Sequence, residues 1–129
     1  MTDHVTFSEA DWKTLRRMKD ELLQRASITA IERVHAIIAG PEADAHKKYI
    51  DLWSALKVED AKIARMFNDM KRSNALFKIF EMTNNQLLTA KEVETFTQDT
   101  RDRIKEMQSA NQAVKQTVAI GTVQMTGIV

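Results

Sequence analysis

The sequence predicts an all-α protein: an elongated three-helix up-down-up bundle with an extra short helical corner and a C-terminal tail that is either flexible or docked. Three observations favour this class. The chain of 129 residues contains only three glycines and one proline, so it has few places to turn. Apolar residues recur with helical spacing over three stretches of about thirty residues, each roughly 45 Å long as a helix. Hydrophobic residues make up 43% and charged residues 29% of the chain, as in a single domain with its own core.

The first long helix has a clear start signal. Ser8 and Asp11 have the spacing of a capping box, and Phe7 and Trp12 occupy the hydrophobic staple positions. One apolar stripe then follows a single face of the helix: Trp12, Leu15, Leu22, Leu23, Ala26, Ala30, Val34 and Ile37. The segments expected in this one domain are an N-terminal arm at 1–7, a first helix at 8–39, a second helix at 41–72, a helical corner at 74–83, a third helix at 90–119 and an apolar tail at 120–129.

The second long helix is expected to begin directly after Gly40, with Pro41 in its first turn. Its residues also form one apolar stripe, the pattern of a helix with one face toward a core. The stripe consists of Ala45, Tyr49, Leu52, Trp53, Leu56, Ile63, Phe67 and Met70. After Ser73 and Asn74 the apolar residues change side, so the helix either kinks there or continues against a different neighbour.

The third long helix opens with a capping box formed by Thr89 and Glu92. Thr97 is a second possible N-cap, which would split off a short helix before the long one. The helix also fits a coiled-coil heptad. Its two core positions hold Thr97, Ile104, Asn111 and Val118, and Val93, Thr100, Met107 and Val114. A buried asparagine in such a seam commonly fixes register or partner number, so Asn111 is a candidate interface residue; a polar residue facing a wet spot in a monomeric bundle is the alternative.

Composition and motifs argue against several classes of protein. There is no cysteine, which excludes disulfides and thiolate chemistry, and nineteen basic residues are balanced by eighteen acidic ones. The apolar runs fall far short of the ~20 residues of a membrane helix, and the polar N-terminal segment does not look like a secretion signal, so we expect a cytoplasmic protein. No phosphate loop, dinucleotide fingerprint or nucleophile elbow is present, so we expect a non-enzyme without a cofactor. Acid pairs such as Glu59 and Asp60 are interpreted as solvated helix faces.

One pair of residues has the spacing of metal ligands. Glu32 and His35 form a Glu-x-x-His pair, which binds metal in carboxylate-bridged four-helix bundles. Such sites use a second Glu-x-x-His pair, and the sequence has none. Both residues also project about 150° away from the centre of the first helix's main stripe. We therefore expect no metal there, and interpret His35 as part of a second apolar line made by Ile28, Ile31, His35 and Ile38.

A short stretch suggests DNA binding. The sequence LLTAKEV at residues 87–93 is similar to the opening of the helix-turn-helix of excisionase-like and MerR-like regulators, and the resemblance extends to Met107. The resemblance implies a recognition helix that would carry Arg101, Arg103 and Lys105. The chain departs from the family where the motif packs and turns. Glu94 replaces a small residue, Thr97 replaces a glycine, and Asp99 replaces a buried aliphatic side chain.

We expect this protein to act by association, as a homo-oligomer or with another protein. The second half of the first helix is apolar on two sides, more than one neighbour needs, and the sequence after Lys115 has no charged side chain. That tail would dock on its own core, swap into a partner or form an edge strand. The candidate interface residues are Ile28, Ile31, His35, Ile38, Phe77, Phe80, Asn111, Val118, Ile120 and Val123. The alternative is a DNA-binding accessory factor that uses a degenerate helix-turn-helix at residues 89–107; otherwise neither nucleic acid nor a membrane is an expected partner.

Overall fold

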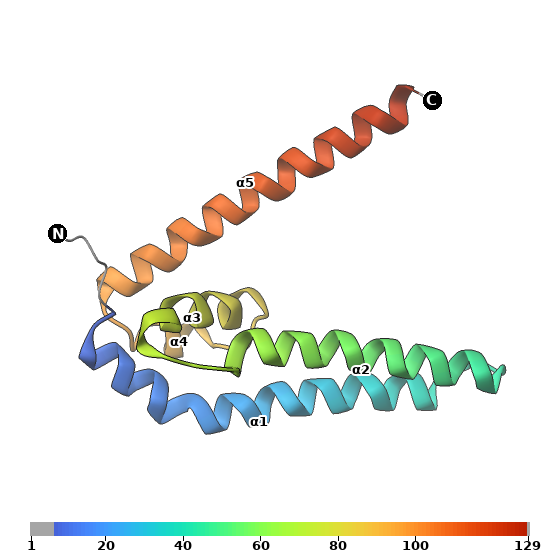
Figure 1. Ribbon diagram of the computed structural model, residues 1–129, viewed down its shortest axis with the longest axis horizontal. Helices are drawn as coiled ribbons and strands as arrows, with labels where there is room; N and C mark the ends of the chain where they lie inside the picture. Colours follow the sequence, from blue (N-terminus) through green and yellow to red (C-terminus); the bar gives the residue numbers. More distant parts are fainter. Residues whose placement is uncertain (1–6, 129) are drawn as a thin grey trace.

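The computed structural model describes the backbone of residues 7–128 and the side chains of residues 7–115. Within this range the chain is helical and contains no strand, which confirms the all-α class. The elements are α1 (Glu9–Ala39), α2 (Ala45–Phe67), the 3-10 helix η1 (Arg72–Asn74), α3 (Ala75–Asn84), α4 (Ala90–Val93) and α5 (Gln98–Ile128). α1 and α2 lie side by side as an antiparallel hairpin, α3 and α4 pack at its base, and α5 projects away from it (Figure 1).

α1 begins where the sequence predicts. Ser8 is its N-cap, and the Ser8 hydroxyl accepts a hydrogen bond from the backbone N–H of Asp11 at 3.1 Å. Phe7 is buried, and Trp12 is half-buried against the core. These contacts fix the entry of the chain into the first helix.

The turn between α1 and α2 is longer than predicted. Gly40 has φ −69° and ψ 171°, which is extended backbone, and α2 does not begin until Ala45. The cap of α2 is Asp44, whose Oδ1 accepts hydrogen bonds from the N–H groups of His46 and Lys47 at 3.0 and 3.2 Å. The prediction that Pro41 lies in the first turn of the second helix is therefore wrong, because Asp44 is the residue that caps the free N–H groups.

α2 ends at Phe67, five residues before the predicted end at residue 72. Asp69 then adopts a left-handed conformation with φ 54°, which turns the chain sharply. The Asn74 side chain holds this turn, since it accepts from the N–H of Lys71 and donates to the Asp69 carbonyl, both at 2.8 Å. The change of apolar side seen in the sequence thus marks a complete break, after which α3 packs back against α2.

The capping box predicted for the third long helix is present. The N–H of Glu92 donates to Thr89 Oγ1 at 3.1 Å, and the N–H of Thr89 donates to Glu92 Oε1 at 2.9 Å. This capping box starts only the single helical turn α4, because the helix is interrupted before Thr97 and α5 starts at Gln98. The sequence left open whether the third helix is continuous or is split at Thr97, and the structure has the split. α5 then continues as helix to Ile128, past the predicted end at residue 119.

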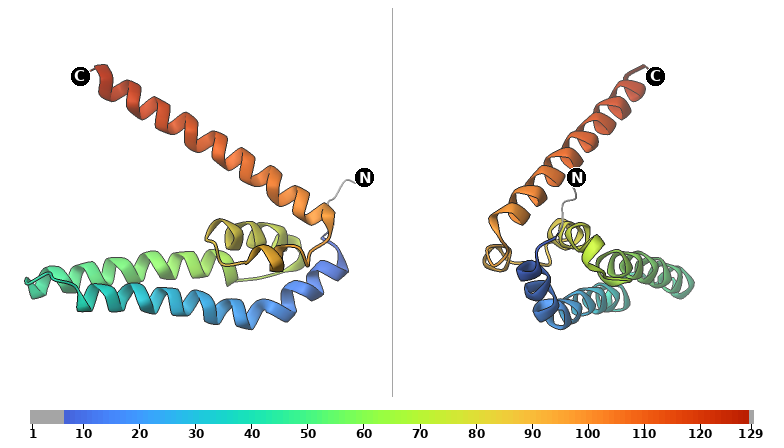
Figure 2. Two further views of the ribbon diagram at one scale, coloured as in Figure 1. Left: turned by 180° about the vertical axis from the view of Figure 1, so that it is seen from behind. Right: turned by 60° about the vertical axis from the view of Figure 1, so that its left-hand side comes forward.

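The core lies at the base of the hairpin. Its largest fully buried apolar side chains are Leu15 and Leu22 of α1, Ile79 and Met82 of α3, and Phe96 before α5. α3 and α4 fill the place beside the hairpin base, and the third long helix leaves the body at an angle (Figure 2). The outer half of the hairpin and most of α5 therefore lie beyond this core.

Candidate interaction surface

The outer part of the hairpin exposes large apolar side chains. Eight of them have between 38% and 67% of their surface exposed: Ile28, Ile31, Ile38, Tyr49, Ile50, Trp53, Leu56 and Val58. Single exposed apolar residues are normal on a protein surface, but a contiguous group on one element is typical of an interaction site. These residues form one surface only where their angular positions around α1 and α2 place them on the same side of the hairpin.

An ion pair with a buried carboxylate lies on the side of the hairpin that faces α3. Arg33 Nη1 of α1 donates to Glu59 Oε2 of α2 at 2.6 Å, and Lys62 Nζ lies 3.4 Å from the same oxygen. Burial raises the pKa of Glu59, but the hydrogen bond from Arg33 and the charge of Lys62 outweigh it, so this pKa lies below its usual value. The interpretation of Glu59 as a solvated residue is wrong, since only 6% of it is exposed; its neighbour Asp60 is exposed.

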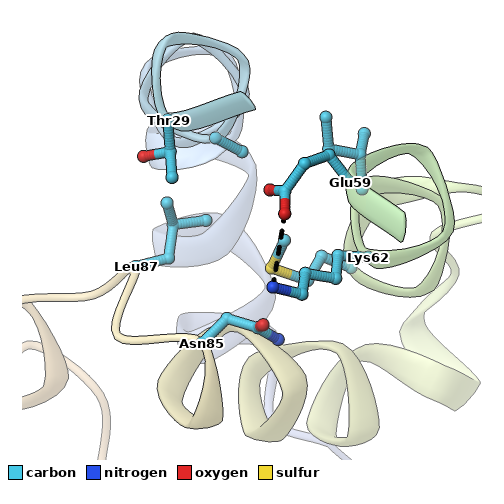
Figure 3. Close-up of a pocket in the computed structure, with 8 residues that line it drawn as sticks. Thr29, Glu59, Lys62, Asn85 and Leu87 are labelled. Atoms are coloured by element: carbon cyan, nitrogen blue, oxygen red, sulfur yellow. Dashed lines mark hydrogen bonds and ion pairs between the residues drawn. The ribbon is translucent and has the colours of Figure 1, made fainter. Parts of the chain in front are cut away.

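A small cavity lies next to this ion pair. Thr29 of α1, Glu59 and Lys62 of α2, and Asn85 and Leu87 after α3 surround it (Figure 3). Its volume is about 60 Å³. Small-molecule sites usually enclose about 300–1,000 Å³, so this cavity has room for a few water molecules and not for a metabolite. Because Lys62 lines this cavity together with Asn85 and Leu87, Lys62 lies on the side of the hairpin that faces α3.

Five of the exposed residues lie on the opposite side of the hairpin, which we call the back face: Ile31, Ile38, Tyr49, Trp53 and Leu56. An α-helix turns about 100° per residue, so Ile31 and Ile38 lie roughly 160° and 140° around α1 from Arg33, counted in the same direction. By the same count, the three α2 residues lie roughly 120° to 180° around that helix from Lys62. The back face thus combines aliphatic side chains of α1 with two aromatic side chains of α2.

The remaining predicted residues of α1 flank the back face. Ile28 is 52% exposed and His35 is also exposed, both on the outer edge of α1. Glu32, which has the spacing of a metal ligand relative to His35 but for which no metal is expected, is exposed as well. In the part of the chain whose side chains are described, no three His, Cys, Asp or Glu residues come together in a group that could hold a metal ion.

The other candidate interface residues are dispersed. Phe77 is 44% exposed, whereas Phe80 is 8% exposed and belongs to the interior of the chain, with its ring centroid 6.3 Å from that of Phe77. Asn111 is half-buried on α5. Three further candidates, Val118, Ile120 and Val123, lie outside the residues whose side chains the structure describes.

Three back-face residues were missed by the sequence interpretation. Tyr49, Trp53 and Leu56 belong to the apolar stripe of the second helix, so they were expected to face a core. The stripe is present, but these three residues lie on the side of α2 that faces away from α3, which leaves them 38–58% exposed. The signal that could have identified them is their type, because Tyr and Trp are enriched at protein interfaces.

A buried carboxylate fixes the start of α5 against α1. Asp11 is 1% exposed and accepts hydrogen bonds from the N–H of Thr97 at 2.9 Å, from Thr97 Oγ1 at 2.7 Å and from Thr100 Oγ1 at 2.6 Å. Burial raises the pKa of Asp11, but these hydrogen bonds outweigh it, so the pKa lies below its ordinary value. We call these three residues the Asp11 network. It determines where α5 leaves the body.

A second polar cluster fixes α4. Arg25 of α1 binds both carboxylate oxygens of Glu92 at 2.7 and 2.8 Å and the Leu87 carbonyl at 2.9 Å. The hydrogen bonds from Arg25 lower the pKa of Glu92 to about 2. Such a bidentate pair has a fixed geometry, so it anchors the capping glutamate as well as the helix it caps.

The proposed recognition helix lies at the start of α5. Arg101 is half-buried, the Arg103 guanidinium lies 3.0 Å from Asp99 Oδ2, and Lys105 is exposed. The helix before the turn, α4, has only four residues. Arg101, Arg103 and Lys105 therefore do not form one exposed basic surface.

No helix in the described part of the chain is long and apolar enough to cross a membrane. Comparison of the chain with known protein families, with curated proteins and with solved structures finds no match.

Proposed function

We propose that this chain is a small non-enzymatic protein that acts by protein–protein association, through self-assembly or as an adaptor or regulator, and that its back face is the contact surface. The observation that carries the proposal is the exposure of Trp53 and Tyr49, at 50% and 58%, between aliphatic residues of both hairpin helices. Large aromatic side chains in a contiguous apolar patch are the residues that most often dominate binding energy at interfaces.

The size of the patch supports the proposal. A half-exposed Trp or Tyr presents roughly 100 Å² and a half-exposed aliphatic side chain roughly 50 Å², so the back face offers about 350 Å² of apolar surface. The largest apolar patch on a typical monomer is about 300–600 Å² and is often functional. Placing a charge at the centre of the patch should therefore prevent association without affecting the core.

The test is the mass of complexes formed by wild-type protein and by Trp53→Glu. Light scattering of the pure protein and crosslinking in an extract of the source cells should both show complexes for the wild type and lose them for Trp53→Glu. Val58→Glu is the matched control, because Val58 is 44% exposed on the same helix but lies away from the back face. If Trp53→Glu and Val58→Glu behave alike, or if the wild type forms no complex in either experiment, the proposal is wrong.

A further inference from the structure

α5 is held at one end and projects from the body along the rest of its length. Its first turns are anchored, since Thr100 and Ile104 are 3% and 2% exposed. Further along, Val114 is 61% exposed, and all three views show the helix leaving the hairpin (Figures 1 and 2). With 31 residues, α5 is about 46 Å long, so the projecting part is roughly as long as α2.

The composition of α5 indicates that this projecting part needs a partner. Met107, Asn111 and Val114 are spaced four and three residues apart, so they share one side of the helix. Residues 116–128 are helical in the backbone and carry no ionisable side chain in the sequence. Helices in water obtain most of their stability from packing an apolar face, and an isolated helix is marginal. A helix that leaves its own core and carries no charge over residues 116–128 has to pack elsewhere.

The back face of the same chain is out of reach. α3 lies between the hairpin and α5 (Figures 1 and 2), so α5 leaves on the α3 side. The back face is on the opposite side of the hairpin, and the Asp11 network holds the start of α5 in place. The chain therefore has two surfaces that cannot meet within the molecule, namely the back face and the side of α5 that carries Met107 and Val114.

The areas of these surfaces favour a second copy as the partner. A stable interface buries about 800 Å² on each partner. The back face, at about 350 Å², provides less than half of that. The part of α5 beyond residue 105 is about 35 Å long and 10 Å wide, which adds a footprint of roughly 350 Å². Each surface alone is too small, and the two together are close to the required area.

We propose that two copies of this chain exchange their α5 helices, so that α5 of each copy packs on the back face of the other in a symmetric dimer. The inference rests on the proposed function and specifies its partner. A two-fold dimer uses the same pair of surfaces twice, which buries both without leaving an open end for further assembly.

Engineered cysteines give a direct test, since the chain contains none of its own. Three full-length proteins are compared after treatment with a short bismaleimide: Val114→Cys, Trp53→Cys and the double variant. The exchange predicts efficient crosslinking to twice the 14.8 kDa chain mass only for the double variant. Dimers from Trp53→Cys alone would show hairpin-to-hairpin packing, and dimers from Val114→Cys alone would show pairing of α5 helices; either would overturn the exchange while leaving association intact. A crosslink within one chain would overturn it too.

Light scattering completes the test. Val114→Glu should convert the dimer to monomer as completely as Trp53→Glu does, with unchanged helix content by circular dichroism. Gln112→Glu is the matched control, because Gln112 is exposed and lies about 200° around the helix from Val114. A wild-type protein that is monomeric at tens of micromolar would refute the exchange. The proposed function would then survive only if Trp53→Glu still abolished crosslinking to a different protein in the cell extract.

Discussion

Replacing Asp11 by asparagine should destabilise the fold more than any other single change of one carboxylate to its amide. The carboxylate is 1% exposed and accepts three hydrogen bonds, all from Thr97 and Thr100. Asparagine has the same shape but only one acceptor oxygen, and its amide turns two further N–H donors toward groups that already donate. The backbone N–H of Thr97 bonds one carboxylate oxygen and the hydroxyls of Thr97 and Thr100 bond the other. The backbone N–H cannot reorient, so in asparagine either this N–H or the two hydroxyls lose their acceptor.

The magnitude follows from the bonds that are lost. A hydrogen bond to a charged group contributes about 1.5–3 kcal/mol, and a buried donor without a partner costs about 1–3 kcal/mol. With one bond retained and a threonine hydroxyl free to rotate, Asp11→Asn should lower the free energy of unfolding by about 2–4 kcal/mol. Small domains are stable by only about 5–15 kcal/mol, so the effect is a large share of the total.

Urea unfolding followed by circular dichroism measures this loss. Asp20→Asn is the control, because Asp20 is exposed on the same helix and should change stability by less than about 0.5 kcal/mol. The pKa of Asp11 is lowered in the folded state, so its contribution is fully present above the unfolded pKa of about 3.9 and is lost as the pH falls through the folded value. The gap between wild type and Asp11→Asn should therefore narrow in acid. A gap no larger than that of Asp20→Asn near neutral pH, or one that does not depend on pH, would refute this account of the Asp11 network.

Four other results are expected. Glu92→Gln should lower the free energy of unfolding by about 1–3 kcal/mol at neutral pH, because it breaks a bidentate pair. The pKa of Glu92 is lowered to about 2, so thermal melts should show the stability of the wild type falling between about pH 4.5 and pH 2. The stability of the variant should change less over this range. Glu59→Met should stay within about 1 kcal/mol of wild type in urea, because Arg33 and Lys62 are 44% and 39% exposed and can turn to water; a loss above about 3 kcal/mol would contradict this. Protein purified without added metal should contain no stoichiometric zinc, and metal that disappears in His35→Ala would show this expectation to be wrong. Duplex DNA should bind only weakly in anisotropy assays; binding tighter than about 10⁻⁸ M at physiological salt, with a sequence preference relaxed by Arg101→Ala, would favour the DNA-binding alternative.

The helices themselves were predictable because their signals are local. Ser8 and the capping box of Thr89 and Glu92 are defined by residues within one helical turn, and the structure contains both. The ends of α2 were not predictable in the same way. Asp44 caps the start of α2, but an aspartate can also occur inside a helix, so its presence does not mark the helix start. The end of α2 after Phe67 depends on Asp69 adopting φ 54°.

The candidate site was predictable only in part, because exposure depends on which elements pack together. The second apolar line of α1, including Ile28, Ile31 and Ile38, is exposed as its position outside the main stripe implied. Trp53 lies in a main stripe and is exposed too, because α3 packs on the opposite side of the hairpin. The spacing of apolar residues does not state on which side of a helix its neighbours will pack.

The Asp11 network also has a consequence for the order of folding. Its hydrogen bonds join residues 86 and 89 positions apart, whereas the ion pair across the hairpin joins residues 26 apart. The entropy lost on closing a loop grows with its length, and contacts close in sequence tend to form first. The α1–α2 hairpin should therefore form early and the attachment of α5 late. Asp11→Asn should then accelerate unfolding by roughly 30-fold to 1,000-fold, the rate equivalent of about 2–4 kcal/mol, and leave the refolding rate nearly unchanged, because interactions absent from the transition state act on the unfolding rate.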